Sequence, residues 1–119
     1  MNEPIRSLYR YKYYFDEFYN AQSPTVKKKV DYVLYLLQHV ERVPEKFLKH
    51  IEGSKGLYEM RVEVQSNIYR VFCCFDEGRL VVLYNGFQKK SQKTPTNEIE
   101  LAERLMAEYF DDKNNKWYG

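Results

Sequence analysis

Residues 57–89 read LYEMRVEVQSNIYRVFCCFDEGRLVVLYNGFQK, and this stretch decides the fold. Its first part alternates between two kinds of side chain. One face of a strand would carry Tyr58, Met60, Val62 and Val64, and the other Leu57, Glu59, Arg61 and Glu63. Residues 68–75 are mainly β-branched and aromatic, as in a buried central strand. With a third apolar run at 79–87 and short polar turns between, the stretch predicts an antiparallel meander.

Helices are predicted on both sides of the meander in sequence. Ser23-Pro24 has the features of an N-cap followed by a first-turn proline, and apolar residues at helical spacing run on toward Pro44. Thr94-Pro95 has the same features and predicts the start of a second helix. The remaining predictions are a strand within 8–13, a helical turn at 15–19, a short helix or turn at 44–52 and a polar tail at 111–119.

The order strand, helix, meander, helix predicts one α+β domain over residues 1–119, with helices packed on one face of an antiparallel sheet. A sheet covered in this way would leave its other face partly open. Lys27, Lys28 and Lys29 fall largely off the apolar stripe of the first long helix. We therefore expect them to form a solvated helix face.

Composition excludes several classes of protein. The chain is 44% hydrophobic and 30% charged, as in globular domains, and its net charge of +2 is too small to mark the whole chain as a nucleic-acid binder. No apolar run approaches the ~20 residues that span a bilayer, and residues 1–6, which lack an apolar core, are not expected to act as a secretory leader. We expect a cytoplasmic protein without a membrane partner.

Residues suited to metal or nucleotide chemistry are scarce. Cys73 and Cys74 are adjacent, so a disulfide between them would be strained, and no Cys-X-X-Cys spacing is present. His39 and His50 lie in separate segments, and none of the five glycines matches a phosphate-loop fingerprint. The sequence therefore predicts reduced thiols and no metal or other cofactor.

Arg70 interrupts an otherwise apolar strand, where a buried charge requires a partner, water or a ligand. Glu59 or Glu63 on the preceding strand could pair with it, and the pairing register decides the outcome. If Glu63 lies opposite Arg70, the two arginines Arg61 and Arg70 share a face. If Val62 lies opposite, they do not. The pattern alone slightly favours a structural ion pair over a ligand site.

An arginine cluster with lysines at the end of a sheet suits phosphate, because the guanidinium fork matches phosphate oxygens. The lysines are Lys89, Lys90 and Lys93, in an acid-free segment. Tyrosines could add base stacking. Metal-free RNA cleavage needs a base for the 2′-hydroxyl, cations for the charged phosphate and an acid for the leaving 5′-oxygen. Tyr, Lys, Arg and Glu could share these roles.

Several strings carry a resemblance to a known family. They are Gly56-Leu57-Tyr58-Glu59-Met60-Arg61-Val62, Asn67-Ile68-Tyr69-Arg70-Val71-Phe72, Phe75-Asp76-Glu77-Gly78, Phe47-Leu48-Lys49 and Gly86-Phe87-Gln88-Lys89-Lys90-Ser91-Gln92-Lys93-Thr94-Pro95. Over most of residues 8–110 the chain resembles the phage-derived HigB-like branch of the RelE/ParE toxin superfamily. The last string is the most specific, whereas the Tyr-Arg-Val strand is shared more widely.

The resemblance implies a RelE-like, microbial RNase-like fold and the toxin of a type II toxin–antitoxin system. It also implies an endoribonuclease that cleaves mRNA on the ribosome without a metal. The implied partners are mRNA, the ribosome and a HigA-like helix-turn-helix antitoxin that neutralises the toxin.

Residue roles follow from the same resemblance. Arg61, Arg70 and Lys90 are expected to be catalytic, with the arginines binding phosphate and stabilising the transition state. We expect the RNA- and phosphate-binding surface to include Lys89, Lys93, Glu59 and Tyr69. Glu59 departs from RelE itself, where this position is basic. It is either a base or a salt-bridge partner of Arg61, and we favour the salt bridge. Tyr58 and Tyr69 are either candidate phenols or, by strand alternation, core residues. The general base and acid stay unassigned.

Two other functions are compatible with this fold. ParE relatives share it yet inhibit gyrase by binding, so the fold does not define the activity. The chain could also be an inert phage-derived interaction module. The retained arginines and lysines favour the ribonuclease, because a gyrase binder has no need of a phosphate-binding cluster.

Overall fold

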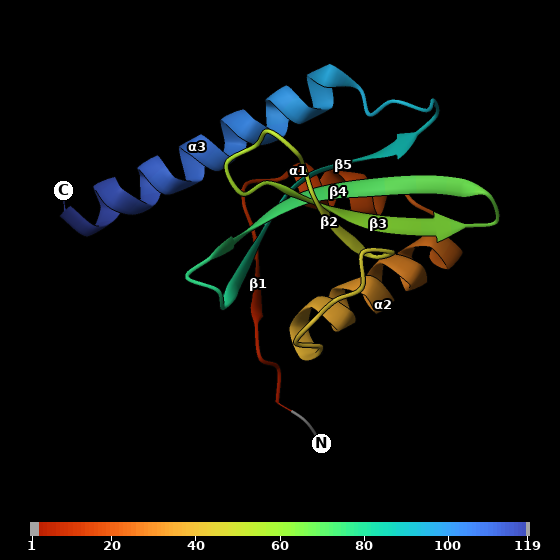
Figure 1. Ribbon diagram of the computed structural model, residues 1–119, viewed down its shortest axis with the longest axis horizontal. Coiled ribbons are helices and arrows are strands. Elements are labelled where there is room, and N and C mark those ends of the chain that lie inside the picture. The colour runs from red at the N-terminus through yellow and green to blue at the C-terminus, as the bar shows by residue number, and fades with distance from the viewer. Residues whose placement is uncertain (1–2, 119) are drawn as a thin grey trace.

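The computed structural model describes residues 3–118, and side chains for residues 3–115 (Figure 1). In chain order its elements are β1 (Ser7–Arg10), α1 (Tyr14–Asn20), α2 (Pro24–His39), β2 (Leu48–His50), β3 (Tyr58–Val64), β4 (Asn67–Asp76), β5 (Leu80–Lys89) and α3 (Thr96–Tyr118). The predicted meander is confirmed as β3, β4 and β5. The α+β class is confirmed as well.

The five strands form one sheet in the order β1-β5-β4-β3-β2. We expected an antiparallel sheet, but β1 pairs with β5 in parallel, so the sheet is mixed. A parallel pair requires a long connection between its strands, and here the chain from α1 to β4 supplies it. Residues 44–52, predicted as a short helix or turn, contain β2, which pairs with one end of β3.

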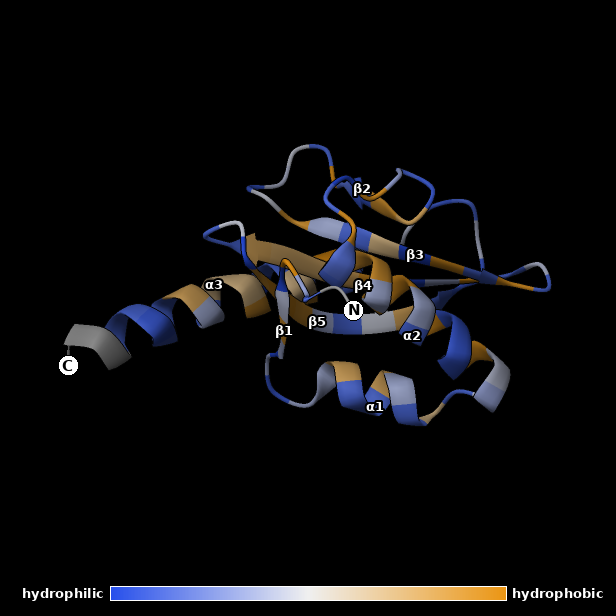
Figure 2. Cartoon of the chain, turned by 90° about the horizontal axis from the view of Figure 1, so that it is seen from below, coloured by the Kyte–Doolittle hydropathy of each residue, from blue (hydrophilic) through white to orange (hydrophobic). Residues whose placement is uncertain are grey.

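Helices cover both faces of the sheet, which corrects the expectation of one covered face (Figure 1). On one face α1 and α2 bury Phe15, Phe18 and Val30 against Met60 and Val71. On the other, α3 packs against a second cluster, which includes Phe72, Tyr84, Ala102 and Leu105. The central strand β4 is therefore buried on both sides, and most of it is coloured as hydrophobic in Figure 2.

Two features at β5 hold helices close to the sheet. Gly86 leaves room for α1, since a Cβ at this position would lie only 2.6 Å from Cγ of Phe18. Next to it, Tyr84 and Asn85 together oppose Phe72, which is a β-bulge. Asn85 Nδ2 then donates hydrogen bonds of 3.0 Å to the backbone and side-chain oxygens of Glu98, at the start of α3.

The far end of α3 is held by a buried carboxylate at the end of β4. The Tyr109 hydroxyl donates to Asp76 over 2.6 Å, and the Lys113 ammonium lies 2.9 Å from the same carboxylate. These contacts explain why the polar segment predicted as a tail from Asp111 is helical as far as Tyr118. Gly119, the last residue of that prediction, lies outside the described residues.

Asp76 makes the stability of the fold depend on pH. Burial opposes ionisation of Asp76, but the hydrogen bonds from Tyr109 and Lys113 outweigh it and hold its pKa below the ordinary value of 3.8. A carboxyl group with a lowered pKa stabilises the fold above its ordinary pKa, and this contribution is lost as the pH falls through the lowered value.

We predict that Asp76→Asn lowers the free energy of unfolding by about 1–3 kcal/mol near neutral pH, since Lys113 loses its buried counterion. Urea denaturation measured from about pH 7 down to about pH 2 should show the difference from wild type shrinking below about pH 4. A difference that stays constant over this range would contradict the assigned role of the Asp76 charge.

Candidate functional site

The β3–β4 turn sets the position of the two arginines. Gln65 and Ser66 both have positive φ, 49° and 74°, as in the tight turns that match the twist of a two-stranded hairpin. Val64 therefore pairs with Asn67, and Arg61 lies directly opposite Arg70. The sequence analysis considered Glu63 or Val62 opposite Arg70, and the observed register differs from both of these registers. It nevertheless places Arg61 and Arg70 on one face of the sheet, as the register with Glu63 would have done.

Glu59 lies between the two arginines. Its Oε2 atom is 3.0 Å from Nε of Arg61 and 3.3 Å from Nε of Arg70. Glu59 is 6% exposed and Arg70 7% exposed, so this contact is nearly removed from solvent. The salt bridge between Glu59 and Arg61 is confirmed, and the same oxygen also serves Arg70.

The three charges do not neutralise one another. Like charges directly opposite on neighbouring strands repel, and one carboxylate offsets only one of the two guanidinium groups. Burial lowers the pKa of Arg70, the charge of Glu59 opposes this shift, and Arg61 adds to it. Because arginine stays protonated in proteins, the cluster keeps a net positive charge at neutral pH.

The Nε atoms of both arginines are buried against Glu59 at ion-pair distance. Within the described residues, neither Nε–H group meets the geometry of a hydrogen bond. Arg70 Nη1 donates to the Tyr69 carbonyl over 3.2 Å, and Arg61 Nη1 makes a long contact of 3.5 Å with the Glu45 carbonyl. The net positive charge of the cluster and the donor geometry of guanidinium groups are suited to an oxyanion.

Both arginines line a cleft of about 440 Å³. Its lining includes Arg61 and Val62, which are neighbours on opposite faces of β3, so the cleft follows the edge of that strand. Lys29 from α2 and Lys46, which precedes β2, add positive charge. Lys29, expected on a solvated helix face, is thus half-buried at the cleft.

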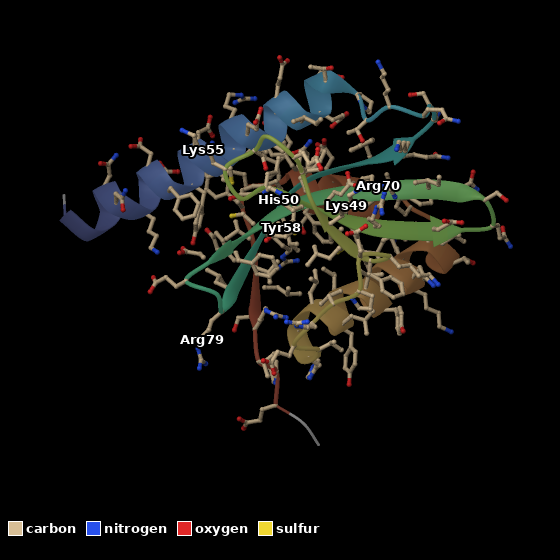
Figure 3. All side chains as sticks on the ribbon, viewed as in Figure 1. Lys49, His50, Lys55, Tyr58, Arg70 and Arg79 are labelled. Carbon is tan, nitrogen blue, oxygen red and sulfur yellow. The ribbon has the colours of Figure 1, made fainter. Side chains whose placement is uncertain are left out.

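Two lysines flank this cluster on the same face of the sheet. Lys49 of β2 pairs with Glu59, and Figure 3 shows it near Arg70. Lys89 of β5 pairs with Ile68, which is the neighbour of Arg70 on this face of β4. Sequence reasoning missed Lys49 because it predicted no strand there. The resemblance did include Phe47-Leu48-Lys49, which was the one signal for it.

Other expected site residues lie apart from the cleft. Lys90 and Lys93 are exposed beyond the end of β5 and do not line it. Tyr69 was expected along the RNA-binding surface, but it is buried on the opposite face, where its ring packs 6.4 Å from that of Phe18. Alternation along β4 is the reason, since neighbours of Arg70 point the other way. Tyr58 packs on that opposite face, beside Phe75.

The remaining reactive groups do not form a second centre near the arginines. Cys73 and Cys74 are free and buried, and burial raises the pKa of each thiol. His39 stacks on Tyr35, and His50 contacts Tyr58. Within residues 3–118, no three His, Cys, Asp or Glu side chains are grouped so that they could hold a metal ion. None of the described helices is long and apolar enough to cross a membrane.

The fold and the site define a small α+β protein with a basic cleft at a sheet edge. The family model described as phage-derived protein Gp49-like (DUF891) matches residues 17–107, a range that contains β2 to β5 and both arginines. The chain therefore belongs to the Gp49-like family of phage-derived proteins, a RelE/HigB-like family associated with the toxins of toxin–antitoxin systems. No curated protein matches the chain.

The shared carboxylate leads to a test of the site. We predict that Glu59→Gln lowers the free energy of unfolding by about 1–3 kcal/mol, because two opposed guanidinium groups lose their counterion. Added phosphate should then raise the urea midpoint of this variant more than that of wild type, as the anion replaces the lost charge.

Glu103→Gln is the matched control, since Glu103 is an exposed carboxylate on α3. Chloride at equal ionic strength controls for screening. If phosphate stabilises Glu59→Gln no more than it stabilises the control, the arginine pair is not an anion site.

Proposed function

We propose that this protein is a HigB-like toxin that cleaves mRNA on the ribosome without a metal and is neutralised by a HigA-like antitoxin in the cytoplasm. The observation that carries the proposal is the pair Arg61 and Arg70, opposed across two strands over one carboxylate and open to a basic cleft. Membership of the Gp49-like family supports the toxin class.

A purely structural ion pair would match each cation with an acid. Here two guanidinium groups share Glu59, and Lys29 and Lys46 add charge to the same cleft. This excess of positive charge is unfavourable for the protein alone and favourable for a bound phosphodiester, whose oxygens accept hydrogen bonds from guanidinium N–H groups. The charge balance therefore favours a ligand site.

The arrangement supports RNA cleavage by attack of the neighbouring 2′-oxygen. A base removes the 2′-hydroxyl proton, the 2′-oxygen bonds to phosphorus, and the bond to the 5′-oxygen breaks as that oxygen gains a proton. The products are a 2′,3′-cyclic phosphate and a free 5′-hydroxyl. Arg61 and Arg70 would donate to the non-bridging oxygens, where negative charge grows in the transition state.

The other residues take supporting roles in this proposal. Glu59, already held by both arginines, positions their guanidinium groups. Lys89, Lys90 and Lys93 follow one another at the exit of β5 and would hold the RNA backbone beyond the scissile phosphate. Neither histidine contacts the arginine pair, so we assign proton transfer to groups other than histidine.

The proposal is tested by inducing the chain in a bacterial host and mapping mRNA 5′ ends together with ribosome positions. We expect wild type to produce new 5′ ends inside translated messages, each with a 5′-hydroxyl. Arg70→Lys keeps the charge but loses the guanidinium fork, and Arg61→Gln removes one cation. Each should reduce cleavage by about 100-fold, the usual cost of one donor to a developing oxyanion.

The matched control is Arg79→Gln, which removes an exposed arginine at the opposite end of β4 from Arg70 (Figure 3). This variant should cleave like wild type. Circular dichroism and urea denaturation of the purified variants show whether each one folds. Growth arrest without new 5′ ends would reject the ribonuclease and indicate a protein target such as gyrase. No growth arrest by wild type or by any variant would indicate an interaction module.

A further inference from the structure

The arginine cleft continues into a second hollow along α2. Both are lined by Lys29, Lys46, Phe47 and Glu63, and the second also includes Lys28 and Tyr32. The continuation exists because β2 pairs only with Tyr58–Met60, which leaves the rest of the β3 edge without a neighbouring strand. We call this continuous feature, from Arg70 to Lys28, the edge groove.

The second part of the edge groove combines aromatic rings with ammonium groups. The rings of Tyr32 and Phe47 lie edge to face, with centroids 6.0 Å apart. Lys29 Nζ is 5.4 Å from the Tyr32 ring centroid and 6.0 Å from that of Phe47. Lys46 Nζ lies 5.5 Å from the Phe47 ring centroid. Two rings and two cations therefore form one cluster beside the arginine pair.

Charge in the edge groove is strongly one-sided, although the net charge of the chain is only +2. Lys28, Lys29 and Lys46 have no carboxylate within ion-pair distance among the described residues, and Glu63 is the one acid in the groove lining. Tyr32 is 49% exposed, so its ring is accessible from solvent.

We propose that the edge groove binds the single-stranded RNA next to the phosphate held by the arginine pair. One base stacks on Tyr32 or Phe47, and the adjoining backbone phosphates lie against Lys29 and Lys46. Aromatic rings among cations are the usual means of binding single-stranded nucleic acid, because every base has a face that stacks. An acidic peptide would use the lysines but would gain less from the rings. This inference rests on the proposed function.

The test measures binding apart from cleavage. Fluorescence anisotropy with a labelled 2′-O-methyl RNA hexanucleotide reports affinity, and the blocked 2′-oxygen prevents the cleavage reaction. Tyr32→Leu and Phe47→Leu keep apolar volume but lose the aromatic ring, and each should weaken binding by about tenfold. Lys46→Gln should weaken binding and lower the slope of log affinity against log salt by about 0.7, as expected for one lost phosphate contact.

Two further variants separate binding from structure. Tyr35→Leu is the matched control for the rings, since Tyr35 is 54% exposed on the same helix but does not line the groove. It should bind like wild type. Glu63→Gln removes the one acid and should strengthen binding about threefold, an effect that a loss of folding cannot imitate.

Either of two results would overturn the inference: no binding of the hexanucleotide by wild type, or wild-type affinity in both ring variants. Lysine-dependent binding of an acidic peptide, without ring-dependent binding of RNA, would overturn it as well and assign the edge groove to a protein partner. Cleavage in cells that depends on Arg70 but not on Tyr32 or Phe47 would reject RNA binding in the edge groove and leave the proposed ribonuclease activity supported. Ring-dependent RNA binding without any cleavage would support the groove and reject the nuclease.

Discussion

One Glu59 oxygen lies 3.0 Å from Nε of Arg61 and 3.3 Å from Nε of Arg70, and the chemistry of the site depends on this arrangement. The carboxylate allows two guanidinium groups to face each other across neighbouring strands, a pairing that would otherwise be unfavourable. It does so without cancelling their combined charge, since one carboxylate offsets only one of the two guanidinium groups. The cluster is thereby stable enough to fold and still suited to bind an oxyanion.

The surrounding fold maintains this cluster through backbone features distant from it in sequence. The turn at Gln65 and Ser66 sets the register that puts the arginines opposite each other. The short strand β2 places Lys49 beside Glu59 and begins only at Leu48, opposite Met60, which leaves the edge of β3 beyond Met60 open. The β-bulge at Tyr84 and Asn85 joins the start of α3 to the sheet. Loss of the turn or of β2 would displace the charges even if every charged residue were kept.

Much of this was predictable from sequence where periodicity is strong. Alternation over 57–64 correctly placed Met60 and Val62 in the core and Arg61 on the other face. The apolar run at 71–75 within β4 also indicated a strand buried on both faces, so coverage of the sheet by helices on both sides could have been predicted from it.

What could not be predicted depends on tertiary contacts. β2 has only three residues, too few for a period to show, and it forms because the edge of β3 accepts it. Lys29 lies on a polar helix face, and only packing of α2 against β3 brings it to the cleft. The tail from Asp111 is helical because Asp76, far away in sequence, holds Lys113. The position of Tyr69 is an exception, because strand alternation alone places its side chain on the face opposite to that of Arg70.

The central claim is that Arg61 and Arg70 form one phosphodiester site. The most direct measurement is an NMR titration of the arginine Nε–Hε signals with a 2′-O-methyl dinucleotide. The account predicts that the signals of Arg61 and Arg70 shift together with a single dissociation constant, while that of Arg79 stays in place. Shifts confined to exposed arginines, or different dissociation constants at Arg61 and Arg70, would contradict it.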